Sequence, residues 1–218
     1  MATSGVTAFS NTARDFVKQA MVRCKAMESG GVPTAEEMAD GIFQINSILK
    51  FWQSKDVGLW RETGGTLTIP ANDASGALPS GIRDVIDARY QVSATNERQM
   101  TRIERAEYFR PPNKEQSGAP TLFYISRQRG AVTMYVWPVP TAETTCKLEY
   151  DRIVETVTGE TQEVDIPEEY TDVLVTVLAA RLSGIFGDTD PVLFNEAKQA
   201  ETAMFDADRP ESYFMGAA

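Results

Sequence analysis

Hydrophobic positions along the chain change their spacing between its middle and its two ends. In the middle, β-branched and aromatic residues form runs of strand length at 121–125, 131–137 and 145–153. The first two runs carry large apolar groups on both faces, and a short polar turn ending in Gly130 joins them. The third run alternates apolar and charged residues. This pattern predicts a compact antiparallel β unit at the centre of the chain.

Two segments before this unit have apolar residues at helical spacing. A first helix is expected from a cap at Asn11 or Thr12 through Met27. Thr34 and Glu37 form the capping box of a second helix. Its apolar stripe consists of Met38, Ile42, Ile45, Leu49 and Trp52. Together the two segments predict a helical hairpin.

Two more helices are predicted after the β unit. The first begins at 166–169, with a proline in the first turn and acidic residues near the positive end of the helix dipole. Its wide apolar face predicts deep burial and consists of Tyr170, Val173, Leu174, Val177, Leu178, Leu182 and Ile185. The last helix starts at Pro191 and has one narrow apolar face: Leu193, Ala197, Ala200 and Met204.

The chain is therefore predicted to be an α+β protein in which a helical module packs beside an antiparallel β-rich lobe. The expected parts are a flexible arm (1–10), the helical module (11–54 and 166–207), the β-rich lobe (57–158) and a tail (208–218). Leu59 and Trp60 are expected to open the first strand of the lobe. For the segment around Val85, a helical turn and a strand both remain open, because periodicity does not decide between them.

Composition narrows the chemistry that the chain can perform. The 218 residues contain no histidine, which excludes histidine-based triads and metal sites. The two cysteines, Cys24 and Cys146, fall on apolar faces and are expected to be small buried residues, with a disulfide between them possible but unsupported. The net charge of −10 argues against a surface that grips nucleic acid. No apolar run is long enough to span a membrane.

One basic-aromatic cluster stands out in the predicted lobe, and it consists of Arg102, Arg105, Tyr108, Phe109 and Arg110. Such mixtures bind single-stranded nucleic acids, but interleaved glutamates neutralise much of this one. Arginine and tyrosine also favour protein interfaces. We therefore predict that the cluster contacts a neighbouring subunit or a partner protein.

A second candidate interface lies in the tail, where Tyr213, Phe214 and Met215 stand among small residues. Exposed aromatic residues at a chain end lower solubility unless something covers them. Two alternatives follow: the tail docks on the protein's own core, or it inserts into a neighbouring subunit or partner.

Several short motifs occur in an order that resembles a known family. They are NSILKFWQ at 46–53, GLW at 58–60, GAP at 118–120, WPVP at 137–140 and DIPEEY at 165–170. Their order and spacing are similar to those of the head-to-tail adaptor (connector) proteins of tailed bacteriophages, with the short-tailed phages as the nearest comparison.

The resemblance implies a virion protein at the portal vertex, made in the host cytoplasm. It implies a ring of twelve copies that joins the portal protein to tail or nozzle proteins, without a membrane. Double-stranded DNA would pass through the axial channel without specific binding. The resemblance implies neither enzymatic activity nor a cofactor.

Acidic residues at the predicted helix starts are candidates for the channel lining or a subunit seam, and they are Glu36, Glu37, Asp40, Glu168, Glu169 and Asp172. The alternative is that they are ordinary solvated helix residues and dipole partners. Trp52 and Trp60 are predicted to anchor the junction of module and lobe.

Two other functions remain open. A phage particle could carry a carboxylate-based cell-wall glycoside hydrolase, which needs two acids facing one cleft. Glu168 and Glu169 do not meet this requirement, because adjacent helical residues point about 100° apart. A generic soluble binding domain would explain the composition but not the order of the motifs.

Overall fold

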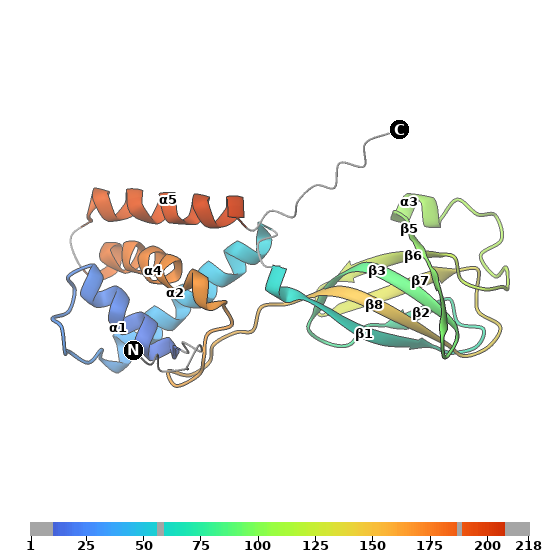
Figure 1. Ribbon diagram of the computed structural model, residues 1–218, viewed down its shortest axis with the longest axis horizontal. Helices are drawn as coiled ribbons and strands as arrows, with labels where there is room; N and C mark the ends of the chain where they lie inside the picture. The colour runs from blue at the N-terminus through green and yellow to red at the C-terminus, as the bar shows by residue number, and fades with distance from the viewer. Residues whose placement is uncertain (1–10, 56–58, 187–188, 208–218) are drawn as a thin grey trace, which may run out of the picture. The chain divides into compact units, whose positions relative to one another are not determined.

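The computed structural model of the protein describes residues 11–55, 59–186 and 189–207. Contacts divide the chain into a helical unit, residues 1–59 and 154–218, and a β unit, residues 60–153 (Figure 1). The α+β class is confirmed, because helices form near both chain ends and strands form in the middle. The predicted N-terminal arm lies outside the described residues.

The helical unit is built around one central helix. Its described elements are α1 (Ala13–Arg23), α2 (Ala35–Ser54), the short 3-10 helix η2 (Glu168–Tyr170), α4 (Thr171–Phe186) and α5 (Pro191–Ala207). Helix α4 contacts α1, α2 and α5, and Figure 1 shows it between α5 and the N-terminal helices. Residues 174–180 are all buried, as expected for a helix that is apolar nearly all round. The predicted face is less deeply buried at its two ends, because Tyr170 and Val173 are only partly buried and Ile185 is 47% exposed.

Both N-terminal helices begin as the sequence predicts. Thr12 caps α1 and Thr34 caps α2, each in a capping box with an acidic residue three positions later. The predicted end of the first helix is wrong. Helix α1 stops at Arg23 because Lys25 adopts a left-handed backbone conformation (φ 61°), and the chain turns there, before Met27.

Helices α1 and α2 approach closely at Gly41. A Cβ atom at this position would lie 2.5 Å from Cγ2 of Val17, closer than real carbon contacts allow. Gly41 therefore permits the close approach of the two helices, and both residues are buried.

The segment 154–165 belongs to the helical unit, whereas the sequence predicts a β-rich lobe that extends to residue 158. The side-chain amide of Asn46 donates to the carbonyl of Val157 (2.8 Å), and its oxygen accepts from the Val157 N–H (2.9 Å). The N–H groups of Ala13 and Arg14 donate to carbonyls at Gln162 and Glu160. The segment thus satisfies donors that the first turn of a helix leaves without partners.

The β unit consists of two sheets. One has the strand order β1-β8-β3-β4 and the other β2-β7-β6-β5. The strands are β1 (Glu62–Ile69), β2 (Ser75–Ala77), β3 (Ile82–Ser93), β4 (Asn96–Gln99), β5 (Thr101–Arg102), β6 (Leu122–Gln128), β7 (Ala131–Trp137) and β8 (Thr144–Arg152). All neighbouring strands are antiparallel except β5 and β6. The open segment around Val85 is thus a strand, whereas Leu59 and Trp60 start a 3-10 helix, η1 (Leu59–Arg61), not the predicted strand.

The core of the β unit consists of inward-facing residues of both sheets. Strands β6 and β7 pair Phe123 with Val136 and Ile125 with Met134, and all four residues are buried in this core. Alternation along the strands turns the intervening pair, Tyr124 and Tyr135, to the opposite face of the sheet. The two strands carry large apolar groups on both faces because this outer face is also covered in part, by residues 105–108.

The two cysteines are free thiols. Cys146 is buried in the β unit, as predicted, and burial raises its pKa to about 11. Cys24 caps the C-terminal end of α1 and is only partly buried, so the expectation of full burial is wrong for this residue.

Candidate interaction surface

A short helix, α3 (Arg105–Tyr108), covers part of the outer face of the second sheet. The N–H of Glu104 donates to the carboxylate of Glu107 (3.3 Å), which closes a capping box and starts the helix. A single helical turn has little stability of its own, so its contacts with the sheet must hold it.

Those contacts are aromatic. The rings of Tyr124 and Tyr135, paired across β6 and β7, are stacked with centroids 5.9 Å apart. Tyr108 lies 5.9 Å from the ring of Tyr124 and 5.7 Å from that of Tyr135, and it is 7% exposed. Burial raises the pKa of Tyr108, with a smaller contribution from Tyr135. Phe109 meets Tyr108 edge to face and is 60% exposed. The four rings form an aromatic cluster that is buried at Tyr108 and open at Phe109.

Lys114 fixes the loop that follows α3. Its ammonium group donates to the carbonyl of Tyr108 and lies 4.7 Å from the centroid of that ring and 5.3 Å from that of Phe109. The indole N–H of Trp137 donates to the carbonyl of Asn113 (3.2 Å). The loop is therefore attached to the sheet beside the aromatic cluster.

A cavity of about 570 Å³ opens between the sheet, α3 and this loop. Its walls include the four aromatic side chains together with Arg105 and Lys114, and Glu115 supplies a carboxylate. Its volume lies within the range of about 300–1,000 Å³ that is typical of ligand pockets. We call this cavity the aromatic pocket.

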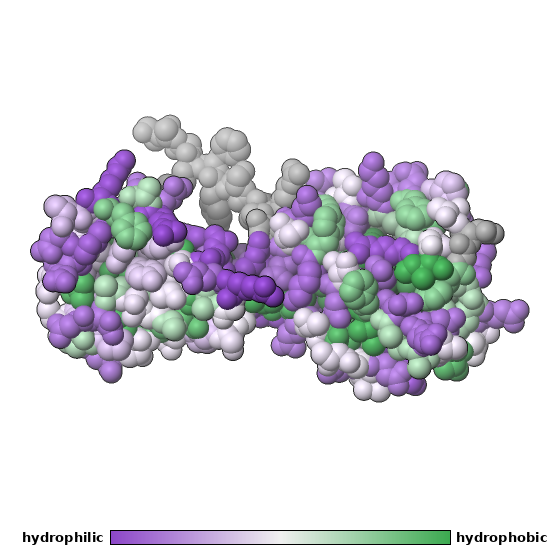
Figure 2. Space-filling model, turned by 180° about the vertical axis from the view of Figure 1, so that it is seen from behind, coloured by the Kyte–Doolittle hydropathy of each residue, from purple (hydrophilic) through white to green (hydrophobic). Residues whose placement is uncertain are grey.

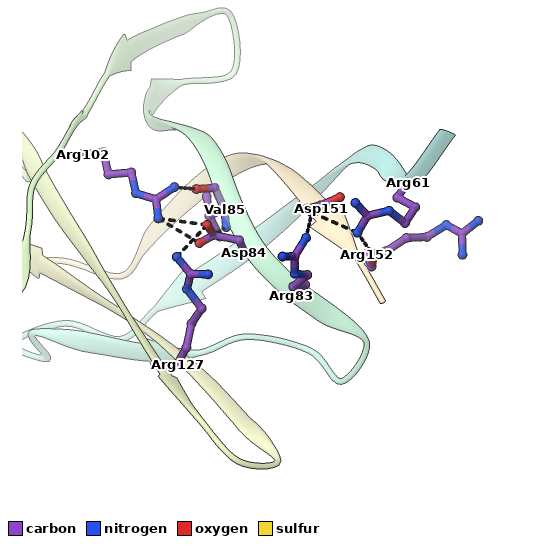
Figure 3. A network of polar contacts seen from close by, with 8 residues as sticks. All are labelled: Arg61, Arg83, Asp84, Val85, Arg102, Arg127, Asp151 and Arg152. Carbon is purple, nitrogen blue, oxygen red and sulfur yellow. Dashed lines mark hydrogen bonds and ion pairs between the residues drawn. The ribbon is translucent and has the colours of Figure 1, made fainter. Parts of the chain in front are cut away.

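Two arginines of the predicted cluster do not line the aromatic pocket. Arg102 donates to both carboxylate oxygens of Asp84 (3.0 Å each) and to the carbonyl of Val85 (2.7 Å) (Figure 3). Arg127 contacts the same carboxylate at 3.1 Å. Asp84 on β3 thus links one sheet to β5 and β6 of the other. Arg110 is exposed beyond the end of α3.

A second network in Figure 3 was not predicted from the sequence. Asp151 accepts from Arg61 (3.1 Å) and Arg83 (3.2 Å), and Arg61 is only 2% exposed. Arg61 directly follows Trp60, and nothing in its neighbourhood in the sequence indicates that its guanidinium is buried.

The two candidate tryptophans, Trp52 and Trp60, belong to different units. Trp52 is buried, and its indole N–H donates to the carboxylate of Glu201 on α5 (2.8 Å). Trp60 is half-buried and belongs to the β unit. That the two tryptophans anchor the junction of module and lobe stays a prediction. Tyr213, Phe214 and Met215 lie outside the described residues.

The six candidate carboxylates differ in their partners. Glu37 accepts from the Thr34 N–H in the capping box, and Asp172 pairs with Arg23 (2.9 Å). Glu36, Asp40, Glu168 and Glu169 are exposed. Glu168 lines a cavity of about 150 Å³, which is small for a ligand pocket, and Glu169 does not line it. Glu168 and Glu169 therefore do not face one cleft together, as glycoside hydrolysis by this pair of acids would require.

Exposed apolar side chains on the helical unit were also not predicted as candidates. The largest exposed fractions on its helices belong to Phe43 on α2 (69%) and Val192 on α5 (65%). Figure 2 shows hydrophobic residues in green patches that interrupt a largely hydrophilic surface. Phe43 stands off the buried stripe of α2, and an aromatic residue on the polar side of a helix is the signal that indicates its exposure.

No group of three or more metal-binding side chains occurs in the part of the chain that the structure describes. None of the described helices is long and apolar enough to cross a membrane.

The fold is that of an α+β protein, and its β unit carries a cavity lined by aromatic side chains. A family model described as SU10 adaptor protein matches residues 33–213. The chain therefore belongs to the SU10 adaptor protein family, and the resemblance to phage head-to-tail adaptors is confirmed. A search of curated proteins found no match to the chain.

Membership of this family implies a structural component of the virion that interacts with portal and tail proteins. The resemblance to short-tailed phages in particular stays a prediction.

Proposed function

We propose that this protein is the subunit of a ring that lies under the portal, joins the capsid vertex to the tail and surrounds the channel for the genome. The match to the adaptor family over residues 33–213 is the observation that carries this proposal. The ring is expected to contain twelve copies, built through heterologous contacts that close on themselves.

The charge of the chain supports this role. Twelve chains of charge −10 would together carry roughly −120 before counterions bind. Acidic walls repel phosphate, so DNA would pass without adhering. The candidates for this lining or for a subunit seam are Glu36, Glu37, Asp40, Glu168, Glu169 and Asp172, of which Asp172 also pairs with Arg23.

Assembly is proposed to depend on the portal. A subunit that formed rings by itself would deplete itself away from the capsid vertex. The free chain is therefore expected to be mostly monomeric.

Sedimentation velocity of the full chain, alone and with purified portal protein, tests both parts. We expect a monomer alone and a large complex of defined stoichiometry with the portal. A stable ring of the free chain would refute dependence on the portal. Failure to bind the portal, together with particle images that locate the chain away from the portal–tail axis, would refute the function itself.

A further inference from the structure

We propose that the aromatic pocket of the β unit receives residues 211–215 from the tail of a second copy of this chain. The inference rests on the proposed ring, and it names one pair of surfaces that would hold neighbouring copies together.

The aromatic pocket offers rings that are not fully covered. Tyr124 and Tyr135 are half-buried on its floor, and Phe109 is 60% exposed at its rim. Aromatic and methionine side chains gain from contact with such a surface through area burial, ring stacking and sulfur–aromatic contacts. The tail supplies these side chains consecutively, as Tyr213, Phe214 and Met215.

Charge adds a second requirement for the occupant. Within the described residues, neither Arg105 nor Lys114 forms an ion pair with a carboxylate. Both line the aromatic pocket beside one acid, Glu115, in a chain whose net charge is −10. The pocket therefore favours an occupant that brings a carboxylate next to aromatic groups. Glu211 stands two residues before Tyr213 and meets this requirement.

A second copy suits this arrangement because a ring needs two different, complementary surfaces on every subunit. The tail follows α5 of the helical unit, and the aromatic pocket belongs to the β unit. Each copy would give its tail to one neighbour and receive a tail from the other. One short segment binds weakly, and closure of the ring multiplies its effect through high local concentration, which agrees with a monomeric free chain.

A peptide titration tests the pocket. The receptor is the full chain with Tyr213→Ala and Phe214→Ala, and the probe is a fluorescein-labelled peptide of residues 208–218. We expect anisotropy to rise with receptor concentration in the micromolar range. Phe109→Ala or Arg105→Glu in the receptor should weaken binding about tenfold or more, as loss of an anchoring contact does.

These two positions are exposed, so their variants should fold normally, which far-UV circular dichroism can check. Phe43→Ala, at an exposed aromatic residue of the helical unit, is the matched control and should leave binding unchanged. A peptide carrying alanine at positions 213 and 214 should not compete. Absence of binding, or equal binding to all variants, would overturn the proposal.

Disulfide trapping identifies which copy provides the tail. In a Cys24→Ser background, one chain carries Gln128→Cys in the pocket wall and a second, size-tagged chain carries Phe214→Cys. We expect a mixed disulfide-linked dimer. Gln99→Cys, on the other sheet, should give none. A chain with both substitutions that closes only on itself would show that the tail fills its own pocket, which overturns the proposal.

The proposal and the proposed function can fail separately. If the peptide binds portal protein and not this chain, the tail is a portal contact and the pocket proposal fails while the adaptor ring stands. If the peptide binds the aromatic pocket but the chain never joins the portal, the ring fails and the pairing of tail and pocket stands.

Discussion

The helical unit buries α4 among three other helices, whereas the β unit closes two sheets over a core and links them by ion pairs. In the helical unit, the core consists of apolar side chains at helical spacing, and ion pairs such as Arg14–Glu160 and Arg23–Asp172 lie at the surface. In the β unit, Asp84 and Asp151 each hold two arginines. From this difference we expect the stability of the helical unit to depend mainly on side-chain volume. The stability of the β unit should depend on side-chain charge as well.

The largest effect is expected at Trp52. Because its side chain is 1% exposed and its indole binds Glu201, Trp52→Ala should lower the free energy of unfolding of the helical unit by about 3–5 kcal/mol. Hydrogen exchange measured separately on peptides of the two units detects which unit loses stability. Phe43→Ala on the same helix is the control, with a change within about 0.5 kcal/mol. Unchanged protection in Trp52→Ala would contradict the buried position of the indole.

Asp151 tests the importance of charge in the β unit. Asp151→Asn removes one negative partner of Arg61, a guanidinium that is 2% exposed, so a loss of up to about 3 kcal/mol is expected in the β unit. Urea unfolding, followed by hydrogen exchange of the β unit, measures this loss of stability. Glu97 pairs with the exposed Lys147, and Glu97→Gln should cost less than about 1 kcal/mol. Equal effects of the two variants would mean that burial of Arg61 does not matter.

Gly41 tests how tightly the helices of the helical unit pack. Gly41→Ala would place Cβ 2.5 Å from Cγ2 of Val17, and overpacking of this kind costs about 1–3 kcal/mol. Gly184→Ala is the matched control, since no atom lies near the added carbon, and there a gain of about 0.5–1 kcal/mol is expected. Thermal unfolding compares the two variants. A stabilised Gly41→Ala protein would show that α1 and α2 have room to separate.

The buried stripe of α2 could be predicted because burial in a helix follows a local period. Met38, Ile45, Leu49 and Trp52 are buried as expected, whereas the fifth predicted member of the stripe, Ile42, is only partly buried. Ile185 has the right spacing and is nevertheless exposed, since spacing does not show where the neighbouring helices end.

The aromatic pocket could be predicted only in part. Arg105, Tyr108 and Phe109 are close in sequence, so their cluster was visible without a structure. Tyr124 and Tyr135 join them through the register of β6 and β7, and register depends on pairing between distant residues. Lys114 contacts these rings from a loop, and hydrophobic periodicity does not predict the path of a loop.

The smallest expected effect concerns the start of α1. The hydroxyl and the N–H of Thr12 donate to the carboxylate of Asp15 (2.6 and 3.0 Å), and these bonds lower the pKa of Asp15. A carboxyl group whose pKa is lowered by folding stabilises the fold above its unfolded pKa of about 3.9 and loses this contribution as the pH falls through the folded value. Asp15→Asn should therefore cost about 1 kcal/mol near pH 7 and progressively less below about pH 4. Urea unfolding of both proteins from pH 7 to pH 3 measures the difference, with Glu28→Gln, in the turn after α1, as a control that should change stability by less than about 0.5 kcal/mol. A cost that stays constant over this range would mean that the side chain of Asp15 stabilises the helix start without its charge.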